Sequence, residues 1–411
     1  MKPNRRVGSD KPATTTFSIA ASILGIATAG AVLLVDARAY APFDAPKRLV
    51  AMLGIAAAVA IAGPQAVRAL RAGCRAQWLA FLTGVAGITL MVVAAIFSPH
   101  RPVALDGVRT VLLFAVVPLI AATDERVWRR VAAGFVTGSA INAALSLLQL
   151  AGVIRLFQYA TKGGRANTSA LIGNDGFLSL TLALSAVVAF GWLLHARKSS
   201  YRRLATVLLV LFAASMTFNL SWTAWLVFLS GAGMLGLLWV TPARRALSLA
   251  SFAAVVVMSV AVLALPRDAA LDAKLTFRMG AWDAAKEMLR DRPLLGFGTG
   301  TYASEFATHR IRADFHAGRR LDNPGLVGSY AEAHNDVLQT LAENGIPATL
   351  AFCIAIGSAL WIAARGERGE HDVVLAVIIA ATVAAVTWFP MQRPATALLT
   401  LAAIGRAWRS R

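Results

Sequence analysis

The sequence predicts an all-α protein that crosses a membrane many times. Of its 411 residues, 57% are hydrophobic and only 15% are charged, which is more apolar and less charged than a typical soluble domain. The apolar residues gather in long runs, and a run of about 17–25 such residues can span a bilayer as a helix. A membrane barrel would instead need short segments of alternating polarity, and the sequence has none.

Twelve apolar runs follow one another along the chain, and each predicts a membrane-spanning helix. A helix is expected because backbone groups in hydrocarbon must form their hydrogen bonds within the segment. The fourth and twelfth runs give the weakest signal, since both are short. In chain order, the runs cover residues 16–35, 48–67, 78–97, 107–123, 131–154, 175–195, 204–220, 222–240, 246–265, 346–364, 372–389 and 394–407.

The positions of Lys and Arg predict the orientation. Both termini and the even-numbered loops hold 21 of the 40 basic residues, whereas the short loops on the other side hold 9. Short cytoplasmic loops carry an excess of Lys and Arg, so both termini are predicted to be cytoplasmic. This topology accounts for most of the net charge of +19. We therefore expect no nucleic-acid partner, and the basic ends are expected to face membrane lipids.

One long connection divides the chain into three parts. Residues 1–265 are predicted to form transmembrane helices 1–9, residues 266–345 a loop on the side away from the cytoplasm, and residues 346–411 helices 10–12. A loop of this length in a compact protein is usually functional. The sequence therefore directs the search for a site to this loop.

Two stretches of the loop have the pattern of amphipathic helices. The first is TFRMGAWDAAKEMLRDRPLLG, which ends near Pro293; the GFGTG that follows predicts a turn, because a dinucleotide motif needs a preceding strand. The second is AEAHNDVLQTLAENG, predicted to be a short helix that carries His334. Leu338 and Leu341 are expected to pack it against the bundle, with a solvated face formed by Glu332, His334, Asn335, Asp336, Gln339 and Glu343.

The sequence lacks the usual parts of several enzyme classes. It has no HExxH pair, no Cys or His cluster with metal-ligand spacing, no GxxxxGK[ST] loop and no GxSxG turn. It also lacks an Asp-x-Asp pair, which could hold a metal on a nucleotide-sugar diphosphate. We therefore predict neither a metal nor a cofactor.

The remaining chemistry is one well-placed histidine with several arginines. A histidine can act as general base near neutral pH, and the planar guanidinium of arginine suits phosphate oxygens. These groups suffice for a reaction in which a hydroxyl attacks and pyrophosphate leaves. Taken alone, however, a solvated histidine explains His334 better. The other loop charges are predicted to be solvated, namely His309, His316, Arg310, Arg312, Arg319 and Arg320.

Three segments resemble the signatures of the O-antigen ligase and polymerase superfamily. His334-Asn335 with Leu338, Leu341, Glu343 and Gly345 resembles its HN-x-x-L-x-x-L-x-E-x-G motif. The stretch from Arg278 and Trp282 to Arg292-Pro293-Leu294-Leu295-Gly296-x-Gly298 resembles its R-x-x-x-W … P-L-x-G-x-G segment, and Gly173-Asn174 is similar to its G-N-x-N region. The resemblance covers about half of the chain, from the fifth to the tenth predicted span.

The resemblance implies a lipid-donor glycosyltransferase of GT-C-like architecture in the bacterial inner membrane, with a periplasmic active site. Its donor would be a glycan on undecaprenyl pyrophosphate, and its acceptor a sugar hydroxyl of lipid A-core. His334 would deprotonate that hydroxyl, which attacks the anomeric carbon with inversion and without a metal. Arg165 and Arg278 would hold the pyrophosphate, with Arg155 as a third candidate, and Asn335 would orient the histidine or the acceptor.

The chain departs from the family pattern at two places. The family often has Ser-Arg after the seventh span, and here Ser221 is followed by Trp222. The second glycine after the HN motif is replaced by Ala348, which follows Pro347. The first departure removes one expected phosphate ligand.

Alternatives remain within the enzyme class and outside it. An O-antigen or capsule polymerase and a protein O-oligosaccharyltransferase would share the donor and the base; the compact chain favours the ligase. A transporter or flippase would also fit twelve spans with both ends inside. The predicted spans, however, contain almost no ionisable residues, and the polar residues collect on one face, which suits surface chemistry better. The sequence does not give the oligomeric state.

Overall fold

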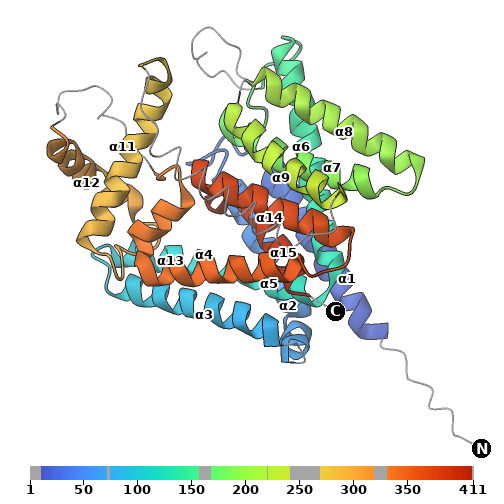
Figure 1. The fold of residues 1–411 in the computed structure, drawn as a ribbon, viewed down its shortest axis with the longest axis horizontal. Helices are drawn as coiled ribbons and strands as arrows, with labels where there is room; N and C mark the ends of the chain where they lie inside the picture. Colours follow the sequence, from blue (N-terminus) through green and yellow to red (C-terminus); the bar gives the residue numbers. More distant parts are fainter. Residues whose placement is uncertain are drawn as a thin grey trace, which may run out of the picture.

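A computed structural model describes residues 11–71, 75–156, 168–219, 221–240, 269–318 and 331–409. Within these ranges the chain is helical and forms no strand (Figure 1). The helices are α1 (Lys11–Leu33), α2 (Ala45–Arg71), α3 (Arg75–Ile96), α4 (Arg101–Phe114), α5 (Val116–Thr123), α6 (Glu125–Leu150), α7 (Asp175–His195), α8 (Ser199–Phe218), α9 (Trp222–Val240), α11 (Ala269–Asp291), α12 (Tyr302–His316), α13 (Asp336–Ala363), α14 (Glu370–Thr387), the 3₁₀ helix η3 (Pro390–Gln392) and α15 (Pro394–Trp408).

The helices confirm a polytopic membrane protein. Ten helical segments in the described ranges are long and apolar enough to cross a membrane, and α4 and α5 together form one of them. The predicted span at 246–265 lies outside the described residues. The predicted span at 394–407 corresponds to α15, which has 15 residues. The count of twelve spans therefore stays a prediction.

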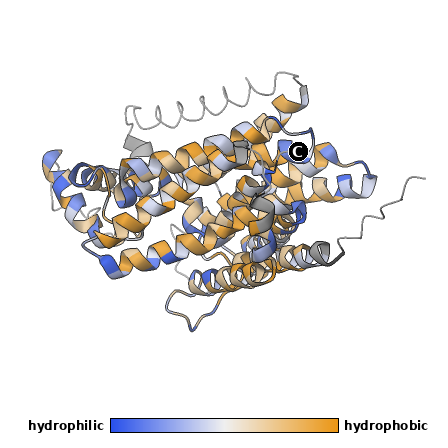
Figure 2. Cartoon of the chain, turned by 90° about the horizontal axis from the view of Figure 1, so that it is seen from below, coloured by the Kyte–Doolittle hydropathy of each residue, from blue (hydrophilic) through white to orange (hydrophobic). Residues whose placement is uncertain are grey.

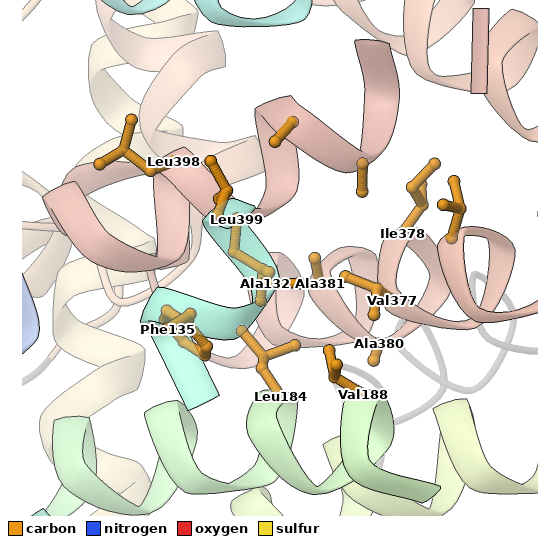
Figure 3. Close-up of a cluster of buried hydrophobic side chains, with 14 of the residues drawn as sticks. Ala132, Phe135, Leu184, Val188, Val377, Ile378, Ala380, Ala381, Leu398 and Leu399 are labelled. Carbon is orange, nitrogen blue, oxygen red and sulfur yellow. The ribbon is translucent and has the colours of Figure 1, made fainter. Parts of the chain in front are cut away.

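The main hydrophobic core lies where α6, α7, α14 and α15 meet (Figure 3). Phe135 of α6 and Leu184 of α7 are fully buried there, with Val377 of α14 and Leu398 of α15. Hydrophobic residues run along the long helices of the protein, as Figure 2 shows. Because α7 and α14 are the most buried of the candidate spans, with 72% and 67% of their apolar windows inside the protein, they form the centre of the bundle.

Small residues let α1 and α6 approach closely. A Cβ atom on Gly134 would lie 2.0 Å from the carbonyl oxygen of Gly25, so neither helix has room for a side chain at this crossing. Close approach at glycine is a usual way to pack helices in a membrane, where lipid tails already solvate larger apolar side chains.

A second, smaller core builds the loop domain, which we define as α11, α12 and the start of α13 (Figure 1). Met288 of α11 and Tyr302 and Phe306 of α12 are buried in it together with Ala342 of α13. Leu338 packs against this core. The prediction that Leu338 packs against the transmembrane bundle was therefore wrong: the loop folds and supplies its own apolar surface.

Helix α13 joins the loop domain to a membrane span, and it bends where the two meet. Gly345 has φ 74° and ψ 176° inside the helix, and Pro347 follows. The kink lies next to residue 346, where the span was predicted to begin, and the division of the chain at this point stays a prediction. The amphipathic helix itself begins at Asp336, so residues 331–335, which were predicted to be helical, form a turn.

Candidate active site

Loops that the charge pattern placed on one side of the membrane meet at one end of the bundle. Arg393, before α15, forms ion pairs with Asp44, before α2, at 3.1 Å and with Glu332, before α13, at 3.0 Å. Lys47 of α2 donates a hydrogen bond to the carbonyl of Leu171, before α7, at 2.6 Å. We call this the site end of the bundle.

His334 lies at the site end, in the turn that precedes α13. It has φ 53°, a left-handed conformation that is uncommon for residues other than glycine and that clusters at functional sites. Its half-buried ring lies 4.9 Å from the ring of Phe389 and 5.9 Å from that of Trp388, both edge to face. His334 is therefore held on a turn against two aromatic rings and not on a helix as predicted.

Buried amides hold this turn. Asn335 is the N-cap of α13, and its side chain accepts a hydrogen bond from the backbone N–H of Leu338 at 2.9 Å. The side-chain oxygen of Gln339 accepts from the N–H of Ala333 at 3.0 Å. The amide nitrogen of Gln339 donates to Glu343 at 3.1 Å. Both ends of the turn are thus anchored to the first turns of α13.

The predicted solvated face of this segment is in fact mostly buried. Asn335, Asp336, Gln339 and Glu343 are between 2% and 6% exposed. The periodicity was correct, but the face contacts polar partners instead of water. Sequence patterns do not distinguish these two environments, because both are polar.

Asp336 places the aromatic rings beside His334. Its carboxylate accepts a hydrogen bond from the backbone N–H of Met391 at 2.8 Å, and its own N–H donates to the carbonyl of Trp388 at 3.3 Å. The segment between α14 and α15 is therefore fixed to the start of α13. Sequence reasoning gave Asp336 no such role.

Arg278 of α11 stacks on the same tryptophan. Its guanidinium carbon lies 4.9 Å from the ring of Trp388, a cation–π contact. Among the described residues, the guanidinium of Arg278 has no ion pair or hydrogen bond, and burial lowers its pKa. An arginine stays charged in a protein, so a half-buried positive charge without a counter-ion in the described chain lies beside His334.

Arg393 is a second cation at this site, and sequence reasoning missed it. Its guanidinium lies 3.9 Å from the ring of Phe177 and 5.1 Å from that of Phe389. Its only signal was its position, as one of few basic residues in short loops on the loop-domain side. Because Asp44 and Glu332 pair with it, Arg393 holds three loops together as well as adding charge.

These surroundings keep the His334 imidazole neutral. Burial, then the charge of Arg278 and then that of Arg393 lower the pKa of His334 from 6.5 to about 4. All three causes act against the imidazolium form. At neutral pH the ring can therefore accept a proton.

The other predicted phosphate ligands are not brought to this point. Arg155 is exposed after α6, and no ion pair or hydrogen bond to the rest of the described chain holds its side chain. Arg165 lies outside the described residues. Trp222, which replaces the family's arginine, begins α9 and is 86% exposed.

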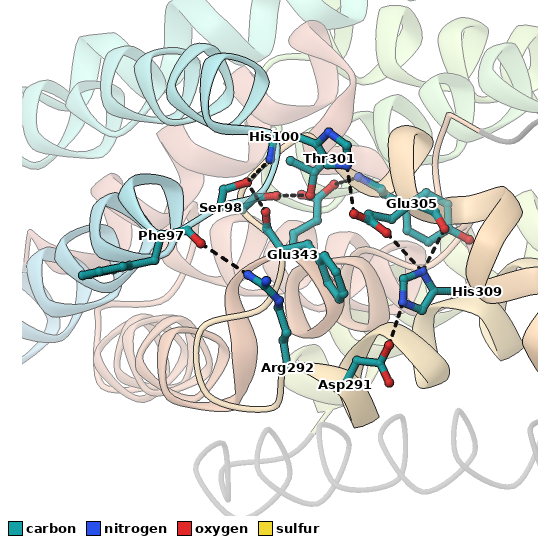
Figure 4. A network of polar contacts seen from close by, with 12 residues as sticks. Phe97, Ser98, His100, Asp291, Arg292, Thr301, Glu305, His309 and Glu343 are labelled. Carbon is teal, nitrogen blue, oxygen red and sulfur yellow. Dashed lines mark hydrogen bonds and ion pairs between the residues drawn. The ribbon is translucent and has the colours of Figure 1, made fainter.

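The loop domain is tied to the membrane helices by a polar network (Figure 4). His100, before α4, lies 2.8 Å from the carboxylate of Glu305. The second carboxylate oxygen of Glu305 is 3.4 Å from His309. The ring of His309 in turn lies 3.2 Å from the carboxylate of Asp291. Hydrogen bonds and charge from Arg312 and His309 lower the pKa of Asp291 although its slight burial raises it.

Two of the charges predicted to be solvated are therefore buried. His309 is 2% exposed, and Arg310, 8% exposed, pairs with Asp314 at 2.7 Å. His316 is exposed, and Arg312 is partly exposed and pairs with Asp291. Arg319 and Arg320 lie outside the described residues. In the described part of the chain, no group of three His, Cys, Asp or Glu side chains is placed to hold a metal ion.

The fold and the site define an α-helical polytopic membrane protein that has, at one end of its bundle, a histidine beside an arginine with no counter-ion among the described residues. Residues 207–353 match the family described as O-Antigen ligase. This range runs from α8 into α13 and includes Arg278, His334 and Asn335. This match supports membership of the O-antigen ligase family, which the sequence motifs also predicted. A search of curated proteins gives no match.

Membership gives the general kind of activity. The family points to a glycosyltransferase-like reaction of the O-antigen ligase or polymerase type. The donor, the acceptor and the role of each residue are separate questions.

Proposed function

We propose that the protein transfers a glycan from undecaprenyl pyrophosphate to a sugar hydroxyl of lipid A-core, at the periplasmic face of the bacterial inner membrane. In this proposal both termini are cytoplasmic, and the site end of the bundle faces the periplasm. The charge pattern of the short loops supports this orientation. Membership of the O-antigen ligase family supports the type of reaction.

The observation that carries the proposal is the pairing of His334 with Arg278 on one tryptophan. Both side chains contact Trp388, at 5.9 Å and 4.9 Å. One can accept a proton and the other can bind an anion. An inverting transfer needs these two functions on opposite sides of the anomeric carbon, and a donor sugar placed between His334 and Arg278 would meet both.

The reaction then follows from the two groups. His334 accepts the proton of the acceptor hydroxyl while its oxygen attacks the anomeric carbon of the donor sugar from the face opposite the pyrophosphate. The bond between that carbon and the pyrophosphate oxygen breaks, and undecaprenyl pyrophosphate leaves with both bonding electrons. Arg278 stabilises the charge on the leaving oxygens, so the leaving group requires no general acid. The anomeric configuration is inverted.

Arg165 and Arg155 remain proposed as further pyrophosphate ligands, and Asn335 as an orienting residue. The N-cap hydrogen bond of Asn335 supports that last role, because it fixes the backbone next to His334. No metal enters the proposed reaction.

The test is transfer by purified protein in the presence of EDTA. Undecaprenyl-pyrophosphate-linked glycan and lipid A-core are supplied, and the product is followed as a shift of the lipid A-core band on a gel. We expect a shift with the wild type and loss of about 10²–10⁴-fold in rate for His334→Ala, the usual contribution of a general base. His316→Ala is the matched control, since this histidine of the same loop domain is exposed.

Other products would change the proposal. Lengthening of the donor glycan without a lipid A-core product would indicate a polymerase. Modification of neither lipid would direct attention to a protein acceptor or to transport. Normal ligation by well-folded His334→Ala would refute the general-base assignment.

A further inference from the structure

A pocket of about 170 Å³ opens at the site end beside the proposed catalytic residues. It lies between the beginnings of α2, α7 and α15, and its wall includes Phe43, Asp44, Lys47, Asn174, Phe177 and Arg393. Complete small-molecule sites usually have about 300–1,000 Å³. A pocket of this size suits one part of a larger ligand.

Lys47 gives this pocket a buried positive charge. The residue is 6% exposed. Its ammonium donates to the carbonyl of Leu171 and lies 5.6 Å from the ring of Phe43. Among the described residues, no carboxylate oxygen lies within 4.0 Å of its ammonium nitrogen, the largest distance counted as an ion pair. Buried charges in proteins are usually paired. An anionic group of a ligand in the pocket could therefore supply the partner that Lys47 lacks.

The one carboxylate in the pocket wall is already engaged. Asp44 pairs with Arg48 at 3.3 Å and with Arg393 at 3.1 Å. Its negative charge is therefore largely balanced by these two guanidinium groups. Arg393, which also lines the pocket, pairs in addition with Glu332. Asp44 attracts Lys47 only beyond ion-pair distance, so the ammonium of Lys47 is the charged group of the lining without an ion pair in the described part of the chain.

Further hydrogen-bond donors and an aromatic wall complete the pocket. The side-chain oxygen of Asn174 accepts from the N–H groups of Gly176 and Phe177 at the start of α7, at 2.9 Å and 3.1 Å. Its NH₂ group has no partner among the described residues, and Asn174 is an exposed residue. The rings of Phe43 and Phe177 provide apolar surface. Donors next to aromatic rings suit a sugar ring, which has hydroxyls at its edge and apolar C–H faces.

The pocket is connected to His334 through a single ring. Phe177 lies 5.1 Å from Phe389, and Phe389 lies 4.9 Å from His334. Arg278 contacts Trp388 instead. The pocket and Arg278 are therefore two separate cationic positions near the same histidine.

We propose that this pocket binds an acidic sugar, meaning a pyranose that carries a phosphate or a carboxylate. The inference rests on the proposed function in that the sugar belongs to a glycan substrate of His334. Lys47 binds the oxyanion, Asn174 donates to a ring hydroxyl, and the two phenylalanines contact the ring. The acidic sugar can belong to the acceptor or to the donor glycan, and both sources have the same recognition chemistry.

The first experiment measures binding without catalysis. Full-length protein in detergent is studied by saturation-transfer NMR with glucose 6-phosphate, glucuronate and methyl glucoside. We expect signals from the two acidic sugars and a much weaker one from methyl glucoside. Lys47→Gln should weaken acidic-sugar binding by about tenfold or more, the scale of one hydrogen bond to a charged group.

Two variants control this measurement. Lys47→Arg keeps the charge and should restore binding, whereas Lys198→Gln removes an exposed lysine before α8 and should leave it unchanged. Size-exclusion profiles and melting temperatures establish that each variant is folded. Equal binding of methyl glucoside and glucuronate, or full binding by folded Lys47→Gln, would overturn the proposal.

The second experiment identifies the source of the sugar by transfer kinetics. If Lys47→Gln has a higher KM than the wild type for lipid A-core, and if this difference disappears with an acceptor that lacks acidic groups, the pocket binds the acceptor. A higher KM only for a donor with an acidic glycan assigns it to the donor. A higher KM for a donor with a neutral glycan would show that the pocket binds pyrophosphate, which overturns the sugar assignment.

The two levels of inference fail separately. Acidic-sugar binding that depends on Lys47, in a protein that transfers no glycan, would support the pocket and refute the proposed function. Glycan transfer by wild type with the same KM values in Lys47→Gln would support the function and overturn the pocket.

Discussion

Replacing Arg278 with glutamine tests how the site controls the proton affinity of His334. The pKa of His334 is lowered from 6.5 to about 4, which corresponds to about 3 kcal/mol in favour of the neutral ring. Burial is the largest cause, and Arg278 and Arg393 follow. Removing Arg278 should therefore raise this pKa by less than half of the difference, and it should stay nearer to 4 than to 6.5.

The assay is the pH dependence of kcat/KM for the donor between pH 5 and pH 8, which reports ionisation in the free enzyme. With a pKa of about 4, about 90% of His334 is still neutral at pH 5, against about 3% for an ordinary histidine. We expect the wild type to keep nearly its full rate at pH 5. Arg278→Gln will be slower at every pH and should lose up to about threefold more at pH 5.

The control is Lys286→Gln, which removes an exposed cation of the same helix that pairs with Asp283. Its pH profile should match that of the wild type. A fall of about 30-fold in the wild type between pH 8 and pH 5 would show that His334 titrates as an ordinary histidine. Identical profiles of the wild type and Arg278→Gln would show that the arginine does not influence the imidazole.

Three further predictions concern the backbone, the turn and acid stability. Gly345→Ala should lower the free energy of unfolding by about 3 kcal/mol or more, because φ is 74° and a Cβ would lie 2.2 Å from a carbonyl oxygen. Thermal melting in detergent measures this effect. The control is Gly357→Ala on the same helix, where no atom lies within 4 Å of the added Cβ. Gln339→Met leaves the N–H of Ala333 buried without its partner, which should cost about 1–3 kcal/mol and lower kcat more than it raises KM; an unchanged kcat would contradict the anchoring role. The unfolded chain binds a proton at His334 below pH 6.5 and the folded chain only below about pH 4. The unfolding free energy should therefore fall by about 3 kcal/mol as the pH falls from 6.5 to about 4. Denaturation of His334→Gln should lack this pH-dependent loss of stability.

The sequence contained the membrane helices and the candidate residues on which the proposed function depends, because each leaves a local pattern. A long apolar run must be a helix in a bilayer, so most spans were predicted near their observed positions. His334 and Asn335 were found through a motif in one short stretch, and Arg278 through a second one. The change from the amphipathic pattern to the apolar run was also visible near residue 346, whereas the kink at Gly345 was found only in the structure.

The surroundings of these residues had no such local pattern. Arg393 reaches Asp44 and Glu332, which are far from it in the sequence, and nothing near Arg393 identifies its partners. Asp336 and Gln339 were expected to contact water but contact backbone groups of the fold. A polar residue at the right helical spacing satisfies either environment, so periodicity alone could not choose between them.

The sequence by itself determined that this chain is a helical membrane protein, and its motifs predicted the family that residues 207–353 match, since hydrophobic length and short motifs are properties of contiguous residues. Only the tertiary structure decided that His334 sits on a strained turn against Trp388 and Phe389, that two arginines suppress its protonation, and that Lys47 lies buried in an adjoining pocket. Burial and electrostatic interaction depend on distances between segments remote in the sequence, and those distances exist only after the helices have packed.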